Sequence, residues 1–167
     1  MSQQQPTLHL VCGKAASGKS TLTAQLGAQP NTVVIAEDDW LSVLYADQMG
    51  SIADYVRNAS RLQKVMGPHV ANLLGAGMSV VLDFPGNTVA QRAWMRDILH
   101  RTKAAHRLHV LDVPDHVCLE RLRARNASGD HPFALSEDQF AQLSKHFVPP
   151  TADEGFDVVL HRWADQS

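Results

Sequence analysis

Short apolar runs alternate with longer stretches of helical periodicity along the 167 residues of the chain. Apolar and β-branched runs that stop at a glycine, a proline or an acidic residue are typical of buried strands. They predict strands at Leu8–Cys12, Asn31–Ala36, Met78–Phe84, Ala105–Val113 and Phe156–His161. Because strands separated by helices form parallel sheets with helices on both faces, the pattern predicts an α/β fold.

The stretches between those runs have apolar residues every three or four positions, which is the spacing of amphipathic helices. They predict helices at Lys19–Leu26, Ile52–Leu74, Thr88–Thr102, Asp115–Asn126 and Glu137–Phe147. Pro68 follows Gly67 inside the second helix, where we expect the helix to divide or kink. Asp112 precedes the fourth helix and is its expected N-cap.

Length and charge narrow the classes of protein to consider. The chain suits one domain, residues 1–167, with a core that needs neither disulfides nor a metal. Its net charge of -2 offers no basic field for nucleic acid or an anionic membrane. Cys12 and Cys118 lack a metal-binding spacing and are expected to be reduced core residues of a cytoplasmic protein. We expect no signal peptide and no membrane span.

Polar or glycine residues stand at or just past the ends of four predicted strands: Gly13, Asp38, Asp83 and Asp112. In parallel sheets, ligands bind beyond the carboxyl ends of the strands. Four separate signals therefore indicate one edge of the sheet as the functional edge.

The segment GKAASGKS begins at Gly13 and ends at Ser20, between a predicted strand and a predicted helix. It has the GxxxxGK[ST] pattern, in which glycines let backbone N–H groups surround phosphate oxygens. Lys19 is expected to reach the β- and γ-phosphates, and the Ser20 hydroxyl to ligate Mg²⁺. The pattern predicts ATP and Mg²⁺ as cofactors, bound by Gly13, Lys14, Ala15, Ala16, Ser17, Gly18, Lys19, Ser20 and Thr21.

Three carboxylates, Glu37, Asp38 and Asp39, follow the second predicted strand. Acidic residues are favoured at any helix N-terminus, so Asp38 is a candidate helix cap. A phosphotransferase also needs a carboxylate to orient and deprotonate the attacking hydroxyl, or to join the Mg²⁺ shell. The two roles are compatible, and which of Glu37, Asp38, Asp39 and Asp83 is the base stays open.

At these residues the chain resembles the small P-loop kinases of the AAA_33 type, a group with polynucleotide 5′-hydroxyl kinases, chloramphenicol phosphotransferases and zeta toxins. In that group the second strand ends in an Asp-x-x-Arg pattern whose aspartate is the base, and DDWL aligns Asp38 with it. Leu41 takes the place of the arginine, which in the polynucleotide kinases helps hold the acceptor phosphate. This departure argues against a polyanionic acceptor.

The segment VVLDFPGNT resembles the DATN segment of the same group, although Asn87 lies four residues after Asp83 rather than three. The resemblance implies that Asp83 holds a water of the Mg²⁺ shell or touches the acceptor, with Asn87 on the acceptor side. The alternatives are a helix cap for Asp83 and ordinary turn chemistry for Asn87. Arg57 is a further acceptor-side candidate, and a solvated helix face is its alternative.

Arg121 and Arg125 lie four residues apart on one face of a predicted helix. In the related nucleoside monophosphate kinases, such a pair before the lid contacts adenine and phosphates. The resemblance implies that Arg121 lies near the base and Arg125 near the β- and γ-phosphates, where a guanidinium suits the transferring phosphoryl group. A surface ion pair is the alternative. Residues 126–149 are then expected to form a lid that excludes water.

These observations predict a P-loop NTPase fold, a three-layer α/β/α architecture with a five-stranded, mainly parallel sheet and a lid. The expected function is transfer of the γ-phosphoryl of ATP to a hydroxyl of a small molecule, with Lys19, Asp38 and Arg125 catalytic and Ser20 and Asp38 at the metal. A polynucleotide 5′-hydroxyl kinase, a sugar-nucleotide kinase and a non-catalytic ATP-binding switch are the alternatives. We expect no nucleic-acid or membrane partner, and a monomer or homodimer.

Overall fold

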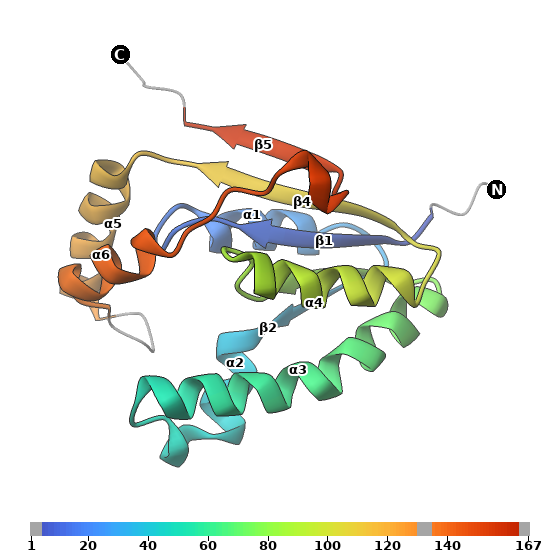
Figure 1. The fold of residues 1–167 in the computed structure, drawn as a ribbon, viewed down its shortest axis with the longest axis horizontal. Helices are drawn as coiled ribbons and strands as arrows, with labels where there is room; N and C mark the ends of the chain where they lie inside the picture. Colours follow the sequence, from blue (N-terminus) through green and yellow to red (C-terminus); the bar gives the residue numbers. More distant parts are fainter. Residues whose placement is uncertain (1–4, 130–134, 164–167) are drawn as a thin grey trace.

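The computed structural model describes residues 5–129 and 135–163. Its centre is a sheet of five parallel strands in the order β2-β3-β1-β4-β5 (Figure 1). The strands are β1 (Thr7–Cys12), β2 (Thr32–Ala36), β3 (Ser79–Asp83), β4 (Ala105–Asp112) and β5 (Val158–Arg162). Each of these strands overlaps one of the strands that the sequence predicts, so the predicted α/β sheet is confirmed.

Helices connect the strands and cover both faces of the sheet (Figure 1). They are α1 (Lys19–Gly27), α2 (Glu37–Leu44), α3 (Ile52–Gly75), α4 (Val89–His100), α5 (Asp115–Ser128) and α6 (Glu137–Lys145). Two short 3-10 helices, η1 (Ala46–Gln48) and η2 (Ala152–Glu154), lie in the connections. None of the helices in residues 5–129 and 135–163 combines the length and apolar composition that a membrane crossing needs.

The main core lies between the sheet and helices α3 and α4. Alternate residues of β1 point into it, and Leu8, Leu10 and Cys12 are fully buried there. On β2, Val33 packs against this core while its neighbour Val34 lies against Gly27 of α1, on the opposite face. This alternation produces the three predicted layers, because successive strand residues point to opposite faces. Cys12 and Cys118 are both buried and free, as predicted.

Helix α3 continues through Pro68 as one element, so the expected division at that residue is wrong. A proline inside a helix removes one backbone hydrogen bond. The helix is held on both sides of it, because Leu62, Met66 and Val70 recur on its buried face and are at most 3% exposed. Tertiary packing over 24 residues therefore outweighs the local loss.

The predicted caps also differ from the structure. Asp112 is the last residue of β4, and its carbonyl accepts a hydrogen bond from the Trp163 N–H at 3.0 Å. The N-cap of α5 is Pro114, which has no side-chain bond to offer, so the Asp112 cap is wrong. Asp38 lies inside the first turn of α2, after an N-cap at Ala36. Asp83 does not cap α4, whose N-cap is Thr88 in a capping box.

A row of three imidazoles crosses the sheet on the face opposite the main core, from β1 through β4 to β5. His9 Nδ1 lies 3.0 Å from His109 Nε2, and His109 Nδ1 lies 3.0 Å from His161 Nε2. Burial, the neighbouring imidazoles and Arg107 lower the pKa of His109 to about 4. The row therefore favours neutral imidazoles that pass hydrogen bonds from strand to strand.

Candidate active site

In the phosphate loop between β1 and α1, Lys19 is hydrogen-bonded to carbonyls of the loop itself. Lys19 Nζ donates to the carbonyls of Gly13 at 2.7 Å and Lys14 at 2.8 Å. Burial lowers the pKa of Lys19; nearby Asp83 opposes this effect and the cation of Arg125 adds to it. Within the described part of the chain, no carboxylate lies in ion-pair distance of this ammonium. The hydrogen bonds that hold this ammonium in the loop therefore come from neutral carbonyls, and Asp83 acts on it from a longer distance.

Backbone geometry explains the glycines of the loop. A Cβ at Gly13 would stand 2.6 Å from Ser17 Oγ, which is closer than packed atoms approach, and 3.2 Å from the Cβ of Leu111, which is a tight contact. Gly18 has a φ of +103°, in the left-handed region where a Cβ is strained. Ala16 also has a positive φ, 59°, at a cost of about 1–2 kcal/mol for an L-residue. Strain of this kind concentrates at ligand-binding loops.

Helix α5 brings both predicted arginines to the phosphate loop. Arg125 is close enough to lower the pKa of Lys19, and its Nε is buried without a hydrogen-bond partner among the described residues. Arg121 Nη1 lies 3.5 Å from the Ala16 carbonyl, and its guanidinium is 5.0 Å from the ring centre of Trp163. Lys19 and Arg125 thus form a cationic pair at the loop, which an anion would neutralise.

Carboxylates lie at the end of β3 and just beyond the end of β2. Ala36 and Asp83 are paired in the sheet, so Asp38 follows β2 close to where Asp83 ends β3. Burial raises the pKa of Asp83, the cation of Lys19 lowers it, and the charges of Asp38 and Asp39 raise it. Asp83 therefore lies within electrostatic reach of both the phosphate-loop lysine and the acidic turn. The structure brings Lys19, Asp38, Asp83 and Arg125 together.

Glu37, which the sequence left among four candidate bases, is only 2% exposed. The Tyr55 hydroxyl donates to Glu37 Oε1 at 2.5 Å, which ties the start of α2 to α3. Burial raises the pKa of Glu37 to about 7, against the effect of the Tyr55 hydrogen bond, and the charges of Asp38 and Asp83 add to the rise. The exposed side chain of Asp38 is the more accessible carboxylate. No local pattern in the sequence indicates that Glu37 turns inward.

Asn87 binds the phosphate loop. Its Oδ1 accepts from the Gly13 N–H at 2.8 Å, and its Nδ2 donates to the Gly13 carbonyl at 2.8 Å. Both halves of the amide are thus engaged with one residue of the loop, away from the acceptor-side role that the resemblance implied. The sequence offers no signal for this pairing, because Gly13 and Asn87 are 74 residues apart.

Arg57 forms an ion pair on its own helix, with its Nη2 2.7 Å from Asp54 Oδ1. Its side chain is half exposed, which is what the solvated-face alternative describes. A different arginine, Arg92 of α4, is fully buried and was not anticipated from the sequence. An arginine in an amphipathic helix normally lies on its exposed face, so periodicity alone gave no reason to place it inside.

Part of the predicted lid segment packs against α5. Residues 126–128 end α5, residues 130–134 lie outside the described residues, and α6 follows. Phe140 of α6 is 3% exposed and packs with Cys118 and Leu122 of α5. The described part of the predicted lid segment is therefore anchored on α5 in this structure.

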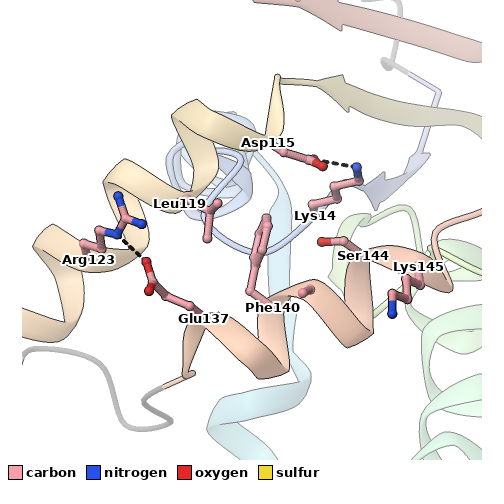
Figure 2. Close-up of a pocket in the computed structure, with 9 residues that line it drawn as sticks. Lys14, Asp115, Leu119, Arg123, Glu137, Phe140, Ser144 and Lys145 are labelled. Atoms are coloured by element: carbon pink, nitrogen blue, oxygen red, sulfur yellow. Dashed lines mark hydrogen bonds and ion pairs between the residues drawn. The ribbon is translucent and has the colours of Figure 1, made fainter.

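A pocket of about 400 Å³ lies between α5, α6 and Lys14 (Figure 2). Lys14 forms an ion pair with Asp115 at 2.6 Å, and Arg123 forms one with Glu137 across the two helices. Lys14 Nζ also lies 5.6 Å from the ring centre of Phe147. The four charged side chains Lys14, Asp115, Arg123 and Glu137 of the pocket lining are therefore already paired with one another, and neither Lys19 nor Arg125 lines this pocket.

The residues present fit a magnesium ion that arrives with a nucleotide. Among the described residues, no group of three or more His, Cys, Asp or Glu side chains is arranged to hold a metal ion. Magnesium in nucleotide sites is held by one or two side chains together with phosphate oxygens and waters, so a preformed cage is not required. The Ser20 hydroxyl is exposed in the first turn of α1, and Asp38 is exposed in the first turn of α2.

Solved structures share this fold. A protein named as a kinase from Chloroflexus aurantiacus is 21% identical over 96% of this chain and 87% of its own, with a TM-score of 0.72. Kti12 of Chaetomium thermophilum, in complex with ADP-AlF3, is 19% identical over 95% and 90%, with a TM-score of 0.67. The APS kinase CysC of Mycobacterium tuberculosis, in complex with AMPPNP and APS, is 21% identical over 98% and 91%, with a TM-score of 0.61.

A family model gives the assignment that these distant structures cannot give alone. No curated protein matched the sequence. The AAA_33 model, described as an AAA domain, matches residues 8–150. That range contains the phosphate loop, both acidic strand ends and the arginines of α5. Because the match spans most of the protein and the fold is that of P-loop kinases, the chain belongs to the AAA_33 family, a P-loop kinase-like group.

Proposed function

We propose that this protein is an ATP-dependent phosphotransferase that moves the γ-phosphoryl group of ATP to a hydroxyl of a small molecule. The observation that carries the proposal is the placement of two opposed charge sets at one edge of the sheet. Lys19 and Arg125 form no ion pair with a carboxylate among the described residues, Asp83 at the end of β3 lies within electrostatic reach of Lys19, and Asp38 in the first turn of α2 lies within reach of Asp83. The carboxylates supply the base that phosphoryl transfer needs in addition to the phosphate-binding cations.

In the proposed reaction, the loop amides and the N-terminus of α1 bind the phosphates. Lys19 exchanges the carbonyls of Gly13 and Lys14 for phosphate oxygens, at a reduced desolvation cost because it is already partly buried. Arg125 directs its unpaired Nε to the transferring group. Ser20, together with Asp38 or Asp83, would hold a Mg²⁺ ion that arrives with ATP, and the ion would supply positive charge to the phosphates.

Asp38 orients the acceptor hydroxyl and takes its proton. The acceptor oxygen forms a bond to the γ-phosphorus, and the bond from that phosphorus to the ADP oxygen breaks. Asp38 is exposed, so an alcohol can reach it, whereas Glu37 is enclosed beneath it. A positioned base of this kind contributes about 10²–10⁴-fold to the rate.

The acceptor side favours a molecule without phosphate groups. Residues 37–58, which form α2, η1 and the start of α3, contain Glu37, Asp38, Asp39, Asp47 and Asp54 but only one basic residue. That residue, Arg57, is paired with Asp54. Leu41, at the position of the arginine in polynucleotide kinases, is fully buried in the core. A nucleic-acid end would meet repulsion here, so the polynucleotide alternative is disfavoured.

A screen with γ-labelled ATP tests the proposal. Pools of neutral, amine-bearing and phosphorylated alcohols, antibiotics included, are incubated with the wild-type protein and with Lys19→Ala. Label is expected in a neutral or amine-bearing alcohol with the wild-type protein and absent with Lys19→Ala. Equal nucleotide affinity and equal transfer in the two proteins would contradict the site. Nucleotide binding without transfer to any pool would favour the switch.

A further inference from the structure

Arg92 is a fully buried cation at the centre of a hydrogen-bonded network. Its Nη1 donates to the carbonyls of Gly86 at 2.9 Å and Val148 at 2.7 Å. Its Nε donates to Glu154 Oε1 at 2.8 Å, and its Nη2 to Glu154 Oε2 at 3.2 Å. The carboxylate therefore meets the fork of the guanidinium with both oxygens, which fixes the orientation of the arginine.

Glu154 is itself held firmly. Arg96 Nη1 donates to its carbonyl at 2.8 Å, and the Thr151 N–H donates to its Oε2 at 2.9 Å. Two arginines of α4, Arg92 and Arg96, thus both bind Glu154 of η2. A buried arginine whose carboxylate partner is removed remains as an uncompensated charge, so the pair is expected to resist separation.

The same network continues to the phosphate loop. Val148 N–H donates to the Asn87 carbonyl at 2.8 Å, and the Asn87 side chain brackets Gly13 with two hydrogen bonds of 2.8 Å. The Gly13 carbonyl also accepts from Lys19 Nζ at 2.7 Å. An unbroken series of contacts therefore joins Glu154, Arg92, Val148, Asn87 and Gly13 to the phosphate-binding lysine.

We propose that Arg92 and Glu154 are positioning residues of the phosphate loop, acting on Gly13 and Lys19 through Val148 and Asn87. When phosphate draws Lys19 away from the Gly13 carbonyl, the Asn87 amide still holds that carbonyl and the neighbouring N–H in place. The orientation of Asn87 depends on Val148, and the position of Val148 depends on the Arg92 fork. Glu154 thereby affects nucleotide binding without touching the nucleotide.

The network also fixes where the predicted lid segment meets the sheet. Helix α6 ends at Lys145, and Val148 is anchored to Asn87 and Arg92 three residues later. Any movement of α6 is therefore confined to residues before Val148. Hydrogen bonds connect the segment from Val148 to Glu154 to α4 and, through Asn87, to the phosphate loop.

Glu154→Gln tests this inference against Asp153→Asn. Asp153 is the neighbouring exposed acid in η2, and replacing it removes the same charge without touching the network. Affinity for ADP and for a non-hydrolysable ATP analogue is measured by titration calorimetry, well below the Tm of each variant. We expect Glu154→Gln to weaken nucleotide binding about 5- to 20-fold. A loss of this size corresponds to one or two hydrogen bonds that no longer hold the phosphate loop in its binding conformation. Asp153→Asn is expected to stay within about twofold of wild type.

A second variant tests the link between this network and the phosphate loop. Asn87→Asp keeps an oxygen opposite the Gly13 N–H but removes the amide donor to its carbonyl, and we expect a similar loss of affinity. In the double variant Asn87→Asp/Glu154→Gln, the fold-loss should be less than the product of the two single losses, because both act on Gly13. Equal nucleotide affinity in Glu154→Gln and Asp153→Asn, or independent effects in the double variant, would overturn the inference.

The activity readout rests on the proposed function, but the binding readout does not. If the wild-type protein binds nucleotide and transfers phosphoryl groups to nothing, the proposed function fails while the calorimetry still decides the inference. Where transfer is observed, the variant should raise KM for ATP with the Asp153→Asn protein unchanged. If Glu154→Gln lowers the Tm but changes neither KM for ATP nor nucleotide affinity, the network has a purely structural role and the inference is wrong.

Discussion

The imidazole row across β1, β4 and β5 gives a pH dependence whose sign and size follow from the structure. His109 is 4% exposed, and its pKa lies at about 4, below the ordinary value of 6.5. The folded state therefore binds its proton less readily than the unfolded chain does. The stabilising contribution is full above pH 6.5 and is lost as the pH falls toward 4. At 1.36 kcal/mol per unit, the shift corresponds to at most about 3 kcal/mol.

The perturbation is His109→Gln, and the control is His69→Gln on the exposed face of α3. Free energies of unfolding are measured by urea titration at pH 7.5, 6, 5 and 4.5. Wild type and His69→Gln should lose about 2–3 kcal/mol more than His109→Gln between pH 7.5 and 4.5, because the variant no longer has the suppressed imidazole. His9, His161 and Arg107 surround the site in all three proteins. Parallel pH profiles for His109→Gln and wild type would refute the reasoning.

Three further predictions concern the site. Gly13→Ala should weaken ADP binding at least about tenfold in calorimetry, because its Cβ meets Ser17 Oγ at 2.6 Å; wild-type affinity would contradict the loop geometry. Arg125→Ala should lower kcat about 10²–10³-fold with a smaller change in nucleotide affinity, and an unchanged kcat in steady-state kinetics would remove this arginine from the proposed reaction. Tyr55→Phe should reduce the free energy of unfolding by about 1–3 kcal/mol, because Glu37 Oε1 loses its donor; urea titration showing no loss would mean that Glu37 is partnered otherwise.

The sheet and helices were predictable because their signals are local. Runs such as Leu8–Cys12 are apolar since β1 is buried on both faces, and a buried strand ends where the chain must turn. The phosphate loop was predictable for a related reason. Its glycines are demanded by backbone geometry within eight residues, from the approach of Ser17 to Gly13 and the left-handed φ of Gly18.

The features of the site that could not be predicted depend on contacts between residues that are distant in the sequence. The Asn87 amide and Gly13 are 74 residues apart, and Arg92 and Glu154 are 62 apart, so no local periodicity connects them. Glu37 stands beside two exposed aspartates, and its inward position depends on Tyr55, which lies 18 residues later in the chain.

Two expectations, the division of α3 at Pro68 and the Asp112 cap, were wrong because tertiary packing and sheet pairing outweighed local preferences. Pro68 weakens a helix in isolation, yet α3 is anchored to the core before and after it. Asp112 was expected to cap α5, but β4 extends through it and pairs it with Arg162 of β5. Asp112 is therefore a strand residue in the sheet, although aspartate is one of the residues that most often cap helix N-termini.

The central claim is that Asp38 serves transfer and not nucleotide binding, and one paired measurement on Asp38→Asn tests it. Titration calorimetry with an ATP analogue and transfer of γ-label to the best acceptor are measured on the same preparation, beside Asp47→Asn as an exposed acid of η1. The account predicts nucleotide affinity within about threefold of wild type and transfer reduced about 10²–10⁴-fold, with Asp47→Asn near wild type in both. Wild-type transfer by Asp38→Asn would contradict it.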